Sequence, residues 1–317
     1  MKTAHVGVAL SDAEASVVSP FTSIDKSIES VVHIIREGRC ALASAFASYK
    51  YIIMYGQIEA FNNVCNAWFL MNFSEYCWVF MDGIWMLTMS LTLPLAQASD
   101  RLSPSQPTAS LLGPITLSSV CGILFWNLAF AILALYVLFQ QDWFQCRKWA
   151  NEDAGNLSVI GDNYEAETLF LVTGLQYITT AMAYNFGYEF RQGWRKNKWF
   201  VISAWFFVAF HVYVTLVPGK LSCIFRVNCD NDNVLYSVAN GATIPIQNYF
   251  NTTVMPVSFR WTLLVIMAVN TLVIIGWDYF VVNGTRKRLG ERMRDKSAKF
   301  VRKAEDDEYE TNGDALA

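Results

Sequence analysis

Charged residues are scarce in this 317-residue chain, where they make up 16% of the sequence against 54% hydrophobic residues. A typical soluble domain carries about a quarter charged residues, so the composition favours a membrane protein in contact with lipid. Basic residues are not in excess either, since 24 Lys and Arg stand against 27 Asp and Glu. Nucleic acid is therefore excluded as a partner, because binding it requires a basic surface that neutralises phosphates.

Metal-ligating residues are also few and dispersed. The chain has three histidines and seven cysteines, with no C-x-x-C pair and no histidine at ligand spacing from a cysteine, so we expect no metal site. Cys223 and Cys229 fall in one predicted loop. They form either a small disulfide in an oxidising compartment or two free thiols.

Long apolar stretches are what the chain does have, and six of them provide the roughly 20 residues that cross a membrane. They cover residues 41–69, 77–97, 115–139, 168–188, 199–218 and 261–282. The first contains Lys50, Glu59 and several asparagines, so we expect other helices to enclose it. Before it, Ser23 to Arg39 carries an apolar stripe typical of an amphipathic helix. The predicted fold class is an all-α polytopic membrane protein with six transmembrane helices.

Lys and Arg concentrate in residues 1–40, 98–114, 189–198 and 283–317, which the six spans place on one side of the membrane. Because positive charge is retained in the cytosol, both termini are predicted to be cytosolic. The opposite loops contain N-x-S/T sequons at Asn156 and Asn251, which are candidate glycosylation sites on a lumenal or exterior side. Residues 5–10 look like a short buried strand without a partner, which points to a missing domain.

Several motifs, met in order along the chain, resemble the type V-B P-type ATPases, which transport polyamines. The stretch A-E-A-S-V-V-S-P-F-T-S over residues 13–23 resembles the end of their phosphorylation domain, and residues 35–42 resemble the stalk that follows it. Lys50-Tyr51 with Tyr55, Asp82, Asn163-Tyr-Glu165 and Leu175-Gln-Tyr-Ile178 resemble motifs of the membrane helices.

The resemblance implies helices five to ten of a P-type ATPase core with a short remnant of the phosphorylation domain. The corresponding segments are 1–22 (end of the phosphorylation domain), 23–40 (stalk helix), 41–282 (six-helix membrane region) and 283–317 (cytosolic tail). The D-K-T-G-T motif, the nucleotide-binding domain and the T-G-D-G-x-N-D magnesium loop are not in these residues. The chain by itself is therefore expected to have no catalytic residue, and ATP and magnesium are expected to act in a parent protein.

We accordingly interpret the chain as a fragment or truncated gene model whose partner is the missing N-terminal half of the pump. A half-transporter that pairs with a separate front half is the alternative.

Ionisable side chains within spans are costly in lipid and are candidates for function. Tyr55 and Glu59 are four residues apart and share one helical face, while Glu75 and Asp82 lie seven apart on the next span. A linear polyamine requires spaced carboxylates with aromatic walls between them, and the resemblance places its binding on these two helices. The predicted substrate-binding residues are Tyr55, Glu59, Asp82, Glu75 and Trp78, with Trp85 as a further aromatic wall.

Structural interpretations of the same residues stay open. The alternative for Glu59 is a structural buried contact with Lys50 or with a neighbouring helix, and Lys50 is expected to neutralise the carboxylates when no substrate is present. The alternative for Glu75 is a position in water at the lumenal edge. We expect Asp278 to be an interfacial charge near the end of the last span, and His211 to be a packing residue rather than a proton relay.

The function that follows is the membrane half of an ATP-driven pump that moves polyamines from lumen to cytosol, in a late endosome, lysosome or vacuole. The alternatives are a type V pump for a metal cation or a transmembrane peptide, and a non-catalytic membrane scaffold.

Overall fold

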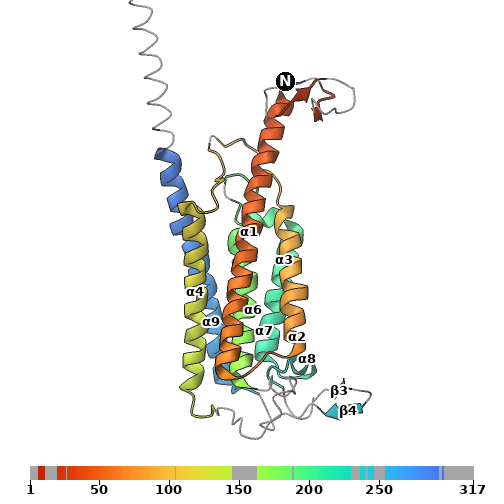
Figure 1. The fold of residues 1–317 in the computed structure, drawn as a ribbon, viewed down its shortest axis with the longest axis vertical. Helices are drawn as coiled ribbons and strands as arrows, with labels where there is room; N and C mark the ends of the chain where they lie inside the picture. The colour runs from red at the N-terminus through yellow and green to blue at the C-terminus, as the bar shows by residue number, and fades with distance from the viewer. Residues whose placement is uncertain are drawn as a thin grey trace, which may run out of the picture.

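The computed structural model describes residues 6–10, 20–25, 27–103, 105–144, 163–187, 189–229, 236–239, 242–245, 254–292 and 295. Over these residues the chain forms a bundle of long helices that stand side by side (Figure 1). The glycosylation candidates Asn156 and Asn251 lie outside the described residues.

The first long helix, α1 (Glu29–Phe69), joins the predicted stalk to the predicted first span without interruption. Gly38 stands near the expected boundary, but a helical glycine costs only about 1 kcal/mol relative to alanine. That is too little to end a helix of 41 residues. The helix ends at Leu70, which adopts the left-handed conformation with a φ of 52° and donates its N–H to the carbonyl of Asn66.

The second span, Glu75–Leu95, is one helical rod made of consecutive pieces with different hydrogen-bond patterns. It begins with α2 (Glu75–Trp78), for which the side chain of Ser74 accepts a hydrogen bond from the N–H of Cys77. The π-helix η1 (Val79–Met86) follows, then α3 (Leu87–Thr92) and the 3-10 turn η2 (Leu93–Leu95). Single turns of π-helix are frequent at functional sites, since they change which side chains share a face.

The remaining long helices are α4 (Pro114–Phe139), α6 (Tyr164–Tyr184), α7 (Lys198–Leu216) and α9 (Val257–Gly276), the last continued by the π-helix η5 (Trp277–Val282). The central one is α6, which packs against α1, α4, α7 and α9 and is buried along almost its whole length. It begins at Asn163, whose Oδ1 accepts a hydrogen bond of 2.6 Å from the N–H of Ala166.

Among the described residues, four helical segments are long and apolar enough to cross a membrane by composition: Glu75–Leu95, Pro114–Phe139, Lys198–Leu216 and Val257–Arg292. The other two predicted spans correspond to α1 and α6, which are more polar. Because α6 is covered by its neighbours, it does not need an apolar surface of its own. The chain is therefore an integral membrane protein of the all-α class, as its sequence predicts.

Two opposite ends of the bundle differ in chemistry. One carries the start of α1, the loops 96–113 and 185–197, and residues 283–292, and we call it the basic end (top of Figure 1). There the loops bond to each other, since Gln192 donates its backbone N–H to the carbonyl of Gln97 at 2.8 Å and its Nε2 to Oδ1 of Asp100 at 2.8 Å. The other carries α8 (Lys220–Ile224) and the antiparallel pair β3 (Tyr236–Ala239) and β4 (Ala242–Pro245), and we call it the disulfide end.

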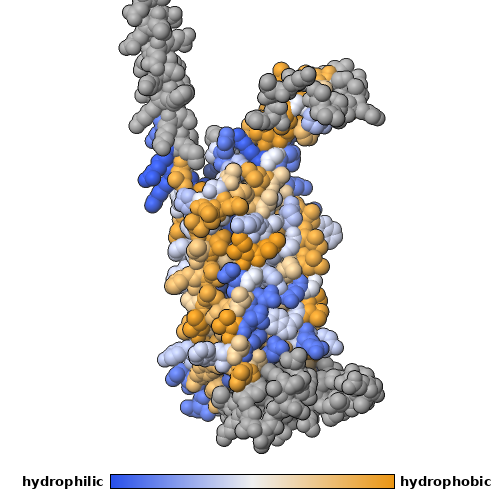
Figure 2. Space-filling model, in the orientation of Figure 1, coloured by the Kyte–Doolittle hydropathy of each residue, from blue (hydrophilic) through white to orange (hydrophobic). Residues whose placement is uncertain are grey.

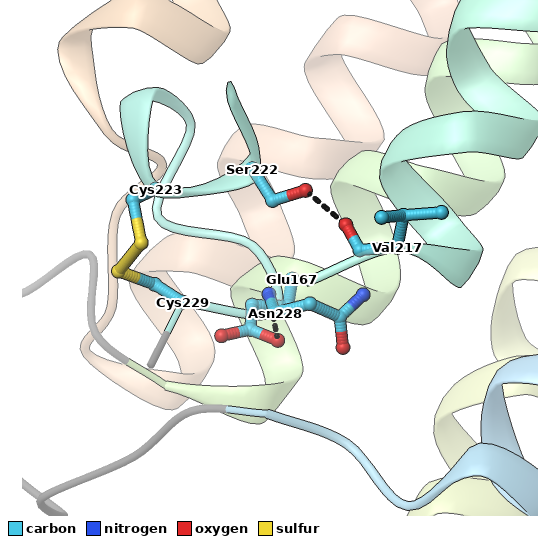
Figure 3. The surroundings of a disulfide bond; sticks show 6 residues. All are labelled: Glu167, Val217, Ser222, Cys223, Asn228 and Cys229. Atoms are coloured by element: carbon cyan, nitrogen blue, oxygen red, sulfur yellow. Dashed lines mark hydrogen bonds between the residues drawn. A yellow bond between two sulfur atoms is a disulfide. The ribbon is translucent and has the colours of Figure 1, made fainter. Parts of the chain in front are cut away.

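A disulfide between Cys223 and Cys229 closes a short loop that ties several helices together at this second end (Figure 3). Within the loop, Asn228 donates its Nδ2 to the last carbonyls of α7, on Val214 and Thr215, and accepts the N–H of Met255 before α9. Its backbone N–H points to the Glu167 carboxylate on α6. The loop thus fixes the ends of three helices.

At the N-terminus, β1 (Val8–Ala9) pairs in parallel with β2 (Phe21–Thr22). The expectation of a solitary buried strand at residues 5–10 is therefore wrong in two respects. The strand has a partner within the chain, and Leu10 beside it is 45% exposed.

Candidate cation-binding site

Two of the predicted binding residues meet between α1 and the second span. The hydroxyl of Tyr55 on α1 donates a hydrogen bond to Oδ1 of Asp82. Asp82 lies in the first turn of η1, the π-helical part of its span. The contact joins a carboxylate and a phenol from different helices at a point where the helix geometry is irregular, which is a common feature of ligand sites in membrane helices.

Glu59 and Tyr177 complete this cluster. Glu59 lies one turn beyond Tyr55 on α1, so the two side chains share one face of the helix. Tyr177 of α6 packs its ring against Tyr55 with the centroids 5.2 Å apart, at an interplanar angle of 42°. Tyr55, Glu59 and Asp82 are partly exposed, whereas Tyr177 is 1% exposed and forms the back wall.

The other two predicted residues lie nearer the disulfide end and make other contacts. Glu75 is exposed in the first turn of α2, as the alternative interpretation expected. The Trp78 indole donates its Nε1 to Oδ1 of Asn72 at 3.2 Å and packs on the ring of Phe73 at 5.2 Å. The structure therefore brings together Tyr55, Glu59 and Asp82, and leaves the other two at the end of the span.

Trp85 is a correction to the sequence analysis. It is fully buried, stacks on Phe170 with centroids 5.5 Å apart, and meets the ring of His211 edge-on at 5.0 Å. Because it packs between helices, its ring presents no open face to a ligand. His211 is a packing residue as expected, with its Nε2 bonded to the carbonyl of Leu171 at 2.7 Å.

The expected role of Lys50 is also wrong. Its Nζ donates to Oγ of Ser119 on α4 at 3.2 Å and lies 4.4 Å above the ring of Tyr184. Lys50 lines the same cavity as Asp278, and Glu59 does not line it. Asp278 is only 2% exposed, so it is buried inside the bundle and is not an interfacial charge.

The residues that the sequence did not predict for this site lie on α6, for which no substrate-binding residue was expected. Besides Tyr177, α6 contributes Thr173, whose Oγ1 accepts a bond of 3.1 Å from Nδ2 of Asn62 on α1. Tyr177 stands in the motif Leu175-Gln-Tyr-Ile178, so a signal was present, but hydropathy alone does not say which face of a buried helix meets α1.

The face beside this cluster is polar and open. Gly56 and Asn63, three residues before and four residues after Glu59, are exposed on the same side of α1. Figure 2 shows hydrophilic surface at mid-height of the bundle, over α1 and the second span, with hydrophobic surface around it. Polar groups at this depth are costly against lipid hydrocarbon. The carboxylates of Glu59 and Asp82, with the polar groups around them, can instead receive an organic cation or a covering protein helix.

Metal ligation is a separate question. Within the ranges that the structure describes, no group of three or more His, Cys, Asp or Glu residues lies close enough to hold a metal ion.

Comparison with known proteins gives consistent relatives, although no family model matches the chain. The chain is 29% identical over 293 residues to "Polyamine-transporting ATPase 13A3" of Homo sapiens, which covers 87% of the chain and 22% of the relative. It is 31% identical over 255 residues to "Probable cation-transporting ATPase 13A5" of Homo sapiens, covering 71% of the chain and 20% of the relative. With "Probable cation-transporting ATPase 13A4" of Gallus gallus the identity is 30% over 263 residues, covering 75% and 21%.

These relatives are type V P-type ATPases, the family that the motifs of this chain resemble. The chain spans about a fifth of the length of the curated relatives that it matches. The chain is therefore homologous to part of the type V P-type ATPases that transport polyamines or other cations.

Proposed function

We propose that this chain forms the cation-binding membrane part of a type V P-type ATPase whose cargo is a polyamine, moved from the lumen to the cytosol of an acidic organelle. The observation that carries the proposal is the contact between Tyr55 and Asp82, with Glu59 one turn away, on an open polar face at membrane depth. ATP hydrolysis is assigned to phosphorylation and nucleotide-binding parts outside these 317 residues.

The chemistry of the cluster suits a polyamine. Two carboxylates on adjacent helices repel each other and lose hydration in the membrane. The one hydrogen bond from Tyr55 to Asp82 brings no positive charge, so a cation between the carboxylates would neutralise what the cluster itself does not. Lys50 does not do so, because it faces Ser119 and Tyr184 instead. The Tyr55 ring, backed by Tyr177, offers an aromatic face for the methylene and ammonium groups of a polyamine.

The open polar face beside Glu59 also gives a reason for a protein partner that covers it in the membrane. Asn63 is exposed one turn beyond Glu59, and in lipid its amide would be costly. Helices of the N-terminal half of the pump are the proposed cover, so that the groove lies between those helices and α1.

The test is the polyamine concentration that gives half-maximal ATPase stimulation in the assembled pump. Asp82→Asn and Glu59→Gln should each raise it by about tenfold or more, because one charge-assisted contact contributes at least about 1.4 kcal/mol. Glu75→Gln is the matched control, since Glu75 is exposed at the end of the same span as Asp82. Equal half-saturation in wild type and both carboxamide variants would contradict the proposal.

A further inference from the structure

A cavity of about 1030 Å³ opens at the basic end of the bundle. Its walls come from α1, residues 99–108, the start of α4, residues 183–191 and the C-terminal part of the last helix. Among the described residues that line it, none belongs to the Tyr55 and Asp82 cluster. The cavity is therefore a separate site, and its ligand is independent of the transported cargo.

Cationic side chains outnumber carboxylates around this cavity. The cations are Lys50, Arg101, Arg191, Arg286 and Lys287, and the carboxylates are Asp278, Glu189 and Glu291. Glu189 already accepts hydrogen bonds from the hydroxyls of Ser103 and Ser105. The balance of charge leaves a cationic excess that an anion would neutralise.

Arg191 is the residue that points to a ligand. It is only 6% exposed, and its Nη2 donates to the carbonyl of Tyr184 at 2.6 Å. Within the part of the chain that the structure describes, its Nε and Nη1 have no hydrogen-bond partner. A buried charged donor without a partner costs more than a neutral one, so these two N–H groups favour an acceptor in the cavity that they line.

The electrostatics agree with the geometry. Burial, together with the nearby charge of Arg286, lowers the pKa of Arg191 to about 10, while Cys40 and Asp278 act in the opposite direction. The guanidinium therefore stays protonated at neutral pH. Lys50 lines the same cavity as Asp278, so this one carboxylate stands against several cations and does not remove the excess.

The walls are mixed rather than wholly polar. Apolar side chains line the cavity between the cations, among them Phe46, Leu102, Ile115, Phe190 and Leu289. A site with an arginine fork among apolar walls, at the end of transmembrane helices, suits a phosphate group that carries an organic substituent.

We propose that this cavity binds a phosphate group through Arg191, with Arg286 and Lys287 at its mouth. The unpartnered Nε and Nη1 groups of Arg191 would donate to phosphate oxygens, and the lysine would add a point charge. The phosphate has two sources, the headgroup of an anionic phospholipid of the adjacent leaflet and a soluble phosphate, and the experiment separates them.

The experiment measures thermal unfolding of the purified chain in neutral detergent while a ligand is titrated. The probes are dioleoylphosphatidic acid, dioleoylphosphatidylcholine as the zwitterionic lipid, and potassium phosphate. Wild type should bind phosphatidic acid with an apparent Kd about tenfold lower than that of Arg191→Gln, with Arg191→Lys intermediate. Arg195→Gln is the matched control, because Arg195 is exposed at the same end and does not line the cavity.

The two sources give different results. Stabilisation by phosphatidic acid alone identifies a lipid headgroup, whereas stabilisation by potassium phosphate that also depends on Arg191 identifies a soluble phosphate. If Arg191→Gln does not fold, the double variant Arg286→Gln/Lys287→Gln at the mouth decides, with the same expected loss. Stabilisation by phosphatidic acid and by potassium phosphate that is equal in wild type and in every folded cavity variant, or stabilisation of wild type by neither, overturns the proposal.

Discussion

Gly174 on α6 is the position where one added methyl group should do most damage to the bundle. A Cβ built there would lie 2.5 Å from Cε1 of His211 and 2.7 Å from the Trp85 ring. Both rings are fixed, since Trp85 is fully buried against Phe170 and His211 is bonded to the carbonyl of Leu171. Gly174→Ala must therefore displace a ring that joins α6 to the second span or to α7.

The magnitude follows from two costs. Overpacking a close-packed core costs about 1–3 kcal/mol, and a buried imidazole that loses its hydrogen bond costs about 1–3 kcal/mol more. Together they predict a loss of roughly 2–6 kcal/mol. With about 2–4 °C lost per kcal/mol in a chain of this size, unfolding should shift down by roughly 4–24 °C.

The assay is thermal unfolding of the purified chain in lipid nanodiscs, followed by circular dichroism. Gly276→Ala at the end of α9 is the control, because a Cβ there has no atom of the described residues within 4 Å and helix propensity favours alanine. Combining Gly174→Ala with His211→Ala should restore part of the loss, since removal of the imidazole makes room for the methyl group. Unfolding of Gly174→Ala within about 2 °C of wild type would refute this packing argument.

Three further predictions concern other parts of the molecule. Cys223→Ser should destabilise the disulfide end by about 2 kcal/mol, the entropy of a closed loop of this short length, and reduction of wild type should give the same shift in thermal unfolding while leaving the variant unchanged. The chain alone should release no phosphate from ATP above a detergent blank, because the phosphoryl-transfer motifs are not in its sequence; measurable turnover would show an unrecognised catalytic site. A C-terminal tag should be digested by protease added outside sealed microsomes, as the Lys and Arg distribution predicts, and protection of the tag would reverse the topology.

Helix positions were largely predictable because hydropathy records where a chain can face lipid. The predicted spans 115–139 and 199–218 correspond closely to α4 and α7. The span predicted at 168–188 is α6, Tyr164–Tyr184, and the difference at its start has a physical cause. Glu165 and Glu167 are buried in its first turn, where the helix dipole and neighbouring side chains tolerate acidic residues that hydropathy rejects.

Side-chain partners were less predictable because they depend on how helices rotate about their axes. Spacing placed Tyr55 and Glu59 on one face, but it carried no information on whether Lys50 turned towards them or towards Ser119. The π-helical turn at Asp82 is equally invisible in the residue pattern, since the same residues fit a regular α-helix. The burial of Asp278 depends on α4, which packs against η5 and is distant in sequence.

The cation site between α1 and the second span is tested by equilibrium binding of radiolabelled spermine to the assembled pump, held in one conformational state. We predict one spermine per pump and a Kd at least about tenfold higher for Asp82→Asn, since that change removes the carboxylate charge to which the Tyr55 hydroxyl donates. Unchanged spermine affinity in a folded Asp82→Asn pump would contradict the placement of the site between α1 and the second span.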